Sequence, residues 1–271
     1  MSVQRPNILM IICHDFGTRA SCYGAPVRTP AIDQLAADGL RFDRYFCTAP
    51  QCSPSRASII TGQSPHQHGV MGLLGQGWEL SDHAVTLPKV LSSAGYDTWL
   101  FGFQHEHHDP SALGYAHDPV GYTMGDVPKI MAENVTTHLS EFLRMRPEGP
   151  WFASVGFFET HVPFHDSYAS PESGHALPFL PDTPAVRRDV SGLDASVMEV
   201  DRCIARICTI LEQSGLADDT ILLFTTDHGI PFPRAKCSLY DPGIRTALVM
   251  RWPRRLVAGR VVAELLSNKD L

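Results

Sequence analysis

Two runs typical of strands, one continuously apolar and one β-rich, are each followed within two residues by an aspartate, and they constrain the fold of this chain more than any other sequence feature. Residues 7–13 lead to Asp15, and residues 220–225 lead to Asp227. A continuous apolar run of this length is typical of a strand buried on both faces of a parallel sheet. Side chains that bind ligands collect at the carboxyl ends of such strands. The two aspartates are far apart in the sequence, so they can meet only if their strands are neighbours in one sheet.

The rest of the chain alternates between patterns typical of helices and of strands. Threonine caps followed by prolines mark two helix starts, and glycines follow the predicted helices as stop signals. The predicted helices are 31–37 (before Gly39), 56–60, 86–95 and 183–215, and the further predicted strands are 40–46, 98–101, 151–158 and 246–250. Residues 167–184 are rich in proline and small polar residues and are predicted to be loop. This order indicates an α/β domain.

Length and composition limit the class of protein. At 271 residues, the chain can bury the core of one α/β domain or of one and a half. Its 44% hydrophobic and 19% charged residues are typical of a soluble globular protein. No apolar run approaches the length that spans a bilayer, and the run 7–13 is too short for a secretion signal. We therefore expect no membrane association and a cytoplasmic location.

Net charge and cysteine content exclude several functions. A net charge of -7 argues against nucleic acid as a partner and gives no long-range attraction for an anion. Any anionic substrate must therefore be held by a local cluster of cations. The seven cysteines are odd in number and contain no Cys-x-x-Cys pair, which argues against a disulfide framework and a structural zinc site. Cys13 and Cys22 are predicted to be core or near-core thiols.

Cys52 stands where a helix is predicted to begin. Pro54 fits a first helical turn and Gly62 fits a helix end. The unpaired backbone N–H groups of a helix N-terminus attract anions and lower the pKa of a thiol. The alternative is a buried structural cysteine before an ordinary helix, because free cysteine is among the most buried residue types.

The pentapeptide Cys-x-Pro-Ser-Arg resembles the signature of the sulfatase family. In that family an enzyme oxidises the cysteine to formylglycine, whose aldehyde hydrate is the nucleophile. All four fixed positions match, as Cys52, Pro54, Ser55 and Arg56. The resemblance extends upstream through Tyr23-Gly24, Thr29-Pro30, Asp33, Leu35, Ala36, Gly39 and Phe42. It implies an alkaline-phosphatase-like fold, with a central, mostly parallel sheet flanked by helices. Residues 1–271 would form the N-terminal catalytic domain, and the usual smaller C-terminal subdomain would be missing.

Other segments resemble one branch of the family more closely. Residues 230–233, 239–240, 242–243 and 181–184 are similar to the sulfamidase branch, which hydrolyses N-sulfoglucosamine. The implied function is hydrolysis of a sulfuric ester or sulfamate, with a sulfated small molecule or saccharide as substrate. A formylglycine-generating enzyme would be the partner in maturation.

The resemblance also implies roles for individual residues. Cys52, as formylglycine hydrate, would attack sulfur, and Arg56 would stabilise the hydrate. His161 would protonate the leaving group, and His105 would remove the second hydroxyl proton so that sulfate is expelled. Lys236 would bind the sulfate. The implied metal ligands are Asp15, Cys52, Asp227, His228 and His14.

Two positions depart from the family pattern. Sulfatases carry an Asp-Asp pair after the first strand, and here His14 replaces its first member. Phe103 stands where a lysine that contacts sulfate is expected. Family sites of oxygen ligands usually hold calcium, whereas nitrogen from His14 and His228 would favour manganese or zinc. We expect calcium, with manganese or zinc as alternatives, because His14 can face away from the site.

Several alternatives stay open. Asp15 alone could be a turn or cap residue, and His161 could be a solvent-facing loop histidine. Residues 105–108 could form a metal cluster, but adjacent residues do not easily converge on one ion. A phosphodiesterase or phosphonate hydrolase of the same superfamily is favoured by Asp227-His228. An inactive anion-binding remnant is suggested by Phe103 and the missing subdomain.

Overall fold

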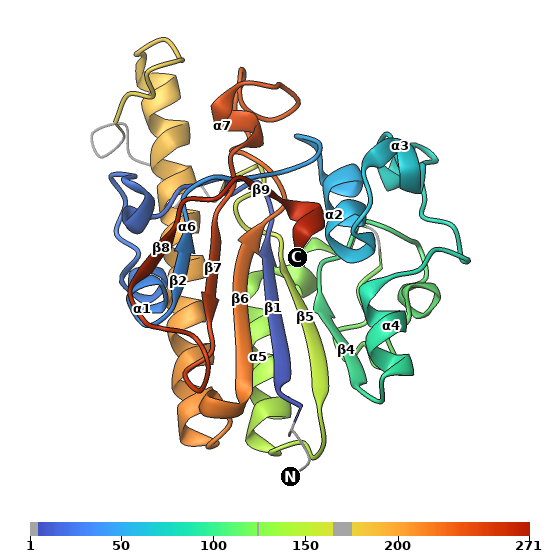
Figure 1. The fold of residues 1–271 in the computed structure, drawn as a ribbon. Coiled ribbons are helices and arrows are strands. Elements are labelled where there is room, and N and C mark those ends of the chain that lie inside the picture. Colours follow the sequence, from blue (N-terminus) through green and yellow to red (C-terminus); the bar gives the residue numbers. More distant parts are fainter. Residues whose placement is uncertain (1–4, 124, 165–174) are drawn as a thin grey trace.

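The protein folds around one large sheet. The computed structural model describes residues 5–123, 125–164 and 175–271. Within those ranges the main sheet has seven strands in the order β4-β5-β1-β6-β7-β2-β8, and a small second sheet pairs β3 with β9. Figure 1 shows β1 between β6 and β5, with α5 and α6 behind the sheet.

The strands and helices have the following bounds. The strands are β1 (Asn7–Cys13), β2 (Leu40–Phe42), β3 (Tyr45–Phe46), β4 (Asp97–Gly102), β5 (Trp151–Phe157), β6 (Thr220–Thr226), β7 (Leu248–Arg251), β8 (Arg260–Val262) and β9 (Leu266–Ser267). The helices are α1 (Pro30–Ala37), α2 (Cys52–Thr61), α3 (Pro65–His68), α4 (Leu87–Ser93), α5 (Ala132–Arg144), α6 (Pro184–Gln213) and α7 (Asp241–Ile244). Short 3₁₀ turns occupy Ser21–Tyr23, Leu74–Gln76, Pro110–Leu113, Val127–Ile130, Ala217–Asp219 and Asn268–Asp270.

The sheet is mostly parallel, as predicted. β4, β5, β1 and β6 run parallel to one another. β7 is antiparallel to both of its neighbours, β6 and β2, and β8 is parallel to β2. The carboxyl ends of β4, β5, β1 and β6 therefore lie at the same edge of the sheet.

The apolar run of β1 is continuous because helices cover both of its faces. Leu9 and Ile11 pack in a core cluster with residues of α1, α5 and α6. Met10 and Ile12 pack in a second cluster with residues of α2 and α4. Successive side chains of a strand point to opposite faces, so a strand covered on both sides needs an apolar residue at every position.

Most predicted elements are confirmed, including the long helix before Gly215. The predicted strand 40–46 is wrong as one element, because the chain leaves the main sheet after Phe42 and Tyr45 starts the second sheet. Helix α1 is capped by Asp38 before Gly39 is reached. Gly39 instead allows close packing, since a Cβ there would lie 2.2 Å from the Met250 carbonyl oxygen. The last predicted strand starts at Leu248 rather than at 246.

Three further expectations concern the loop, the thiols and the membrane. Residues 175–183 form no helix or strand, and the part of the predicted loop from 167 to 174 lies outside the described residues. All seven cysteines, each of them in the described ranges, are free thiols, with Cys13 buried and Cys22 half-buried. Of the helices that the structure describes, none has the length and apolar character needed to cross a bilayer.

Substituting Gly156 by alanine is expected to destabilise the protein strongly. Gly156 lies in β5, where a Cβ would be 1.8 Å from the Phe103 carbonyl oxygen. Because backbone rather than a flexible side chain must move, we expect Gly156→Ala to lower the free energy of unfolding by about 3 kcal/mol. Gly149→Ala is the control. Gly149 has a φ of +75°, and a Cβ there would have no neighbour within 4 Å. The only loss of stability expected is that of an alanine held in the left-handed conformation, about 1 kcal/mol. Urea unfolding of both variants measures the difference, and equal losses would contradict the clash.

Candidate active site

The two acidic motifs meet at the carboxyl ends of β1 and β6. These strands are paired with Cys13 opposite Thr226. The backbone N–H of Asp227 donates to the Cys13 carbonyl at 3.1 Å, and the backbone N–H of Asp15 donates to Asp227 Oδ1 at 3.0 Å. Asp15 has a φ of +51°, a left-handed conformation that aspartate tolerates better than most residues. Both carboxylates are fully buried, which makes a turn or cap role on the surface untenable for Asp15.

Helix α2 presents Cys52 to this cluster as its first residue. Gln51 is the extended N-cap, and Gly62 ends the helix with a φ of +65°, as the sequence predicts. The Ser55 hydroxyl donates to the backbone carbonyl of Asp227. Asn268 in turn donates from Nδ2 to Ser55 Oγ at 2.7 Å. These contacts fix the start of α2 against the end of β6.

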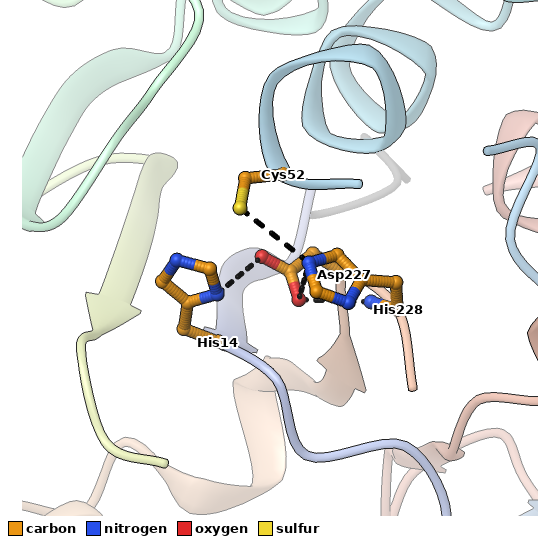
Figure 2. A group of neighbouring side chains, drawn as sticks. All are labelled: His14, Cys52, Asp227 and His228. Atoms are coloured by element: carbon orange, nitrogen blue, oxygen red, sulfur yellow. Dashed lines mark hydrogen bonds and ion pairs between the residues drawn. The ribbon is translucent and has the colours of Figure 1, made fainter. Parts of the chain in front are cut away.

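The strand ends and the start of α2 bring sulfur, nitrogen and oxygen donors together. One donor atom each of His14, Cys52, Asp227 and His228 lies within 4.8 Å of the others. Figure 2 shows these four side chains grouped around the Asp227 carboxylate. The Cys52 Sγ lies 3.5 Å from His228 Nε2, and all four residues are buried.

Two cations hold the two carboxylates. Arg56 Nε donates to Asp227 Oδ2 at 2.9 Å inside the protein. Lys236 Nζ donates to both oxygens of Asp15, at 2.9 and 2.8 Å. The Arg56 side chain is only 1% exposed, whereas that of Lys236 is 20% exposed. Lys236 is therefore the cation of this pair that solvent, and a bound anion, can reach.

The expectation that His14 faces away from the site is wrong. Its Nδ1 lies 2.7 Å from Asp15 Oδ1 and 3.1 Å from Asp227 Oδ2. The ring stacks on Phe103 with centroids 4.9 Å apart and planes at 14°. The physical reason is that Phe103, buried at the end of β4, supplies a flat apolar surface that holds the imidazole toward the carboxylates. The ranking of calcium over manganese or zinc therefore loses its premise.

The remaining two predicted histidines lie at the edge of the cluster. His161 Nε2 lies 4.0 Å from Asp15 Oδ2, and its side chain is 28% exposed. His161 is thus partly open to solvent and also part of the cluster. His105 lies with its ring 5.4 Å from that of Phe103, and it hydrogen-bonds to the Cys52 side chain. His107 and His108 are instead directed to Asp82 and Glu79, so residues 105–108 do not converge on one ion.

The cluster favours a thiolate at Cys52. Burial alone raises the pKa of this thiol, but the positive charge of His14 and hydrogen bonds from His105, His14 and His228 bring it well below its ordinary value. The opposite balance acts on His14: burial lowers its pKa, and the charges of Asp15, Cys52 and Asp227 raise it well above the usual value. Such strongly shifted groups in one buried cluster are typical of functional sites.

Burial and charge also oppose each other at the carboxylates. Burial raises the pKa of Asp15, and the charges of His14 and His228 lower it below its ordinary value overall. Burial likewise raises the pKa of Asp227, but His228, His14 and Arg56 hold it well below the ordinary range. Burial lowers the pKa of Lys236, and Asp15 raises it above the usual value. Both carboxylates are thus ionised at neutral pH and able to bind a cation.

All nine predicted site residues lie in or beside one cluster. Sequence reasoning missed the parts that support it: Asn268, which is buried and fixes Ser55, and Phe103 as a platform. Nothing in the sequence distinguishes Asn268 from other polar residues near the C-terminal end. Phe103 was visible as a departure from a motif, but its contacts were not.

The fold and the cluster together define a class of protein. An α/β sheet carries ionised carboxylates, imidazoles and a potential nucleophile at its strand ends, next to a partly exposed cation. This combination is typical of hydrolases of anionic esters, and its donor atoms are of the kinds that can hold a metal ion. The family itself is settled by comparison: a sequence model described as Sulfatase matches residues 6–271, and the chain belongs to the sulfatase family.

Known proteins with related sequence or structure are also sulfate- or phosphonate-related enzymes by name. Human N-sulphoglucosamine sulphohydrolase is 29% identical over 301 residues, covering 98% of this chain and 59% of that protein. A solved phosphonate monoester hydrolase from Agrobacterium radiobacter has a TM-score of 0.76 at 27% identity, covering 98% of this chain and 72% of that one. A protein solved with its substrate D-glucosamine-2-N,6-O-disulfate has a TM-score of 0.81 at 20% identity, covering 98% and 75%, and shows the fold alone.

The chain spans between 51% and 62% of the length of the curated relatives it matches.

Proposed function

We propose that this chain forms the catalytic domain of a sulfatase that hydrolyses a sulfate ester or sulfamate on a saccharide. The observation that carries the proposal is the position of Cys52, in the complete signature, at the start of α2 and 3.5 Å from His228. There the helix N-terminus, Arg56 and Lys236 supply positive charge around the one side chain that the family converts to a nucleophile.

The donor set fits a divalent metal held by Asp15, Asp227, His228 and His14, with residue 52. His14 Nδ1 supports this, because it is a buried ring nitrogen directed at both carboxylates, 2.7 Å from Asp15 Oδ1 and 3.1 Å from Asp227 Oδ2. Formylglycine at position 52 would supply an aldehyde hydrate as nucleophile, and the metal would neutralise charge on the sulfate oxygens. The donor atoms that the chain presents determine which of calcium, manganese and zinc binds most tightly.

The remaining residues have roles set by exposure and contact. Arg56 is buried and paired with Asp227, so it orients that carboxylate and places a fixed positive charge near residue 52. Lys236 is more exposed and would bind a sulfate oxygen. His105, beside Cys52, would accept a proton from residue 52, and His161, which solvent reaches, would exchange a proton with the leaving group.

A saccharide substrate is supported by a pocket beside the signature. It has a volume of about 460 Å³, and its lining includes Pro50, Gln51 and Pro54 next to Cys52. Pockets of this size suit small organic ligands. Human N-sulphoglucosamine sulphohydrolase, by its name, acts on an N-sulfated sugar, so sulfamates belong among the substrates to test.

The experiment joins maturation to turnover. The chain is co-expressed with a formylglycine-generating enzyme, and mass spectrometry of the peptide that contains Cys52 measures conversion of thiol to aldehyde. We expect conversion, and release of inorganic sulfate from sulfated glucosamines only by converted protein. Unconverted Cys52 together with no sulfate release would overturn the proposal.

A phosphonate or phosphodiester hydrolase is the second candidate. It is favoured by the Agrobacterium radiobacter phosphonate monoester hydrolase at 27% identity and by His228, which offers nitrogen beside Asp227. Parallel assays with a sulfate ester and a phosphonate monoester of the same alcohol separate the two. Faster turnover of the phosphonate would favour this candidate over the sulfatase.

Removing the His161 imidazole is expected to lower kcat more for substrates with a poor leaving group than for substrates with a good one. If His161 protonates that group, His161→Ala lowers kcat about 100-fold or more on a sugar sulfate, but less than about 10-fold on nitrophenyl sulfate, whose anion leaves unaided. His83→Ala, at an exposed histidine in a turn outside the pocket beside the signature, is the control and leaves both rates unchanged. Equal losses on the two substrates would assign His161 a role other than proton donor.

A further inference from the structure

One imidazole belongs to both groups of potential metal donors in the site. His14 lies within 4.8 Å of donor atoms of Cys52, Asp227 and His228, and also of Asp15 and His161. Of the residues in these two groups, His14 alone is shared. It is therefore the donor best placed to complete either ligand set.

The orientation of His14 is fixed by aromatic packing. Phe103 stacks on one side at 4.9 Å, and Phe158 meets the ring edge-on at 5.6 Å. Phe103 is itself held by the Arg56 guanidinium, 4.6 Å from its ring centroid. His14 is 1% exposed. A ring packed in this way keeps Nδ1 directed at the carboxylates without rearrangement when an ion binds.

The donor chemistry disagrees with a calcium site. Calcium takes six to eight oxygen ligands. Among the described residues of the two groups, the carboxylates are Asp15 and Asp227, and both are already paired with a cation, Lys236 and Arg56 respectively. The other members are histidines and Cys52. Imidazole nitrogen and sulfur suit zinc, which needs only four ligands.

We propose that His14, oriented by Phe103, is a metal ligand in this chain and makes the site select zinc over calcium. The inference rests on the proposed function only in placing the metal at this cluster. His14 stands at the position of the first aspartate in the family motif, and Phe103 stands at the position of the family lysine. These two residues are thus in direct contact here. When His14 binds a metal as a neutral imidazole, the loss of a carboxylate at 14 and the loss of a cation at 103 remove one charge of each sign, and the stacked pair occupies both positions.

Calorimetric titration of the metal-free chain with Zn²⁺ and Ca²⁺ tests the proposal. The titrations use the unsubstituted chain and the Cys52→Ala variant. The variant shows whether the preference for zinc over calcium persists without the sulfur of residue 52. We expect tighter binding of zinc than of calcium in both. His14→Gln should weaken zinc binding at least about 10-fold, and Phe103→Leu, which keeps an apolar side chain but removes the ring stack, about 10-fold. His14→Asp should move the preference toward calcium.

A second measurement guards against misfolding of the variants. Reconstitution of the unsubstituted chain with Co²⁺ should give hyperfine-shifted imidazole N–H signals in proton NMR from both His14 and His228. His66→Gln is the matched control and should leave affinities and signals unchanged.

The outcomes separate this proposal from the sulfatase proposal. Tighter binding of calcium than zinc, or shifted signals from His228 without His14, would overturn the role of His14 even if sulfate is released. Zinc binding through His14 without any sulfate release would support it and count against the sulfatase reaction.

Discussion

Replacing Cys52 by alanine is expected to abolish multiple turnover of sulfate esters, with a loss of at least about 10⁴-fold in kcat. Cys52 lies at the first position of α2 and is 3% exposed, so no other nucleophile can take its place without moving the helix. The folded structure should change little, because alanine fits the volume that the thiol leaves. Sulfate release under saturating substrate, with circular dichroism to check folding, measures the effect.

A serine substitution and a second cysteine make this test specific. In Cys52→Ser the hydroxyl could accept a sulfuryl group once, but it carries no second hydroxyl from which His105 could remove a proton. We therefore expect at most one equivalent of alcohol product per chain, followed by no further turnover. Cys203→Ala is the control, at a buried cysteine of α6 outside the site. Its kcat should stay within about threefold, because its effect is a small cavity rather than lost chemistry. Multiple turnover by Cys52→Ala would remove residue 52 from the mechanism.

The position of the site could be predicted because strand periodicity determines it. An apolar run at 7–13 requires cover on both faces, and such a strand is parallel to its neighbours with its ligands at the carboxyl end. The same reasoning applies to 220–226, so the sequence alone predicts Asp15 and Asp227 at one edge of the sheet. Helix α2 followed equally from local rules, with Pro54 in the first turn and Gly62 at the end.

The side-chain contacts inside the site could not be predicted from local rules. That Phe103 stacks on His14 depends on how the end of β4 packs beside that of β1 across β5, which is a tertiary arrangement. The buried role of Asn268 depends on a contact with Ser55, which lies 213 positions earlier in the sequence. The break at Asp43 similarly reflects pairing of Tyr45 with Leu266 in a second sheet. Each of these features joins residues far apart in sequence, where neither propensity nor periodicity carries information.

Neutralising Asp227 is expected to have the largest effect on stability. Asp227 is fully buried, pairs with Arg56 Nε at 2.9 Å and accepts the backbone N–H of His228 at 2.8 Å. Asp227→Asn keeps the shape but removes the carboxylate that is hydrogen-bonded to the buried Arg56 guanidinium, which costs about 3 to 5 kcal/mol. Asp182→Asn is the control, because Asp182 pairs with Arg187 at 2.6 Å on the surface. Exposed pairs contribute about 1 kcal/mol or less, so urea unfolding at pH 7 should separate the two variants clearly.

The pH dependence gives this prediction a second test. Because His228, His14 and Arg56 hold the pKa of Asp227 well below its ordinary value despite burial, the folded chain keeps the carboxylate ionised when the unfolded chain has already taken up a proton. The stability that the carboxylate provides is therefore fully present above the unfolded pKa, about 3.9, and is lost as the pH falls toward the folded pKa. The difference between the unsubstituted chain and Asp227→Asn should be largest near pH 5, because Asp227 also raises the pKa of His14 and His228 and that contribution is complete only below the unfolded histidine pKa, about 6.5. It should narrow below about pH 4 as the carboxylate contribution is lost. A difference that does not change with acid, or a loss at pH 7 no greater than that of Asp182→Asn, would show that the Arg56 pair does not hold the site together.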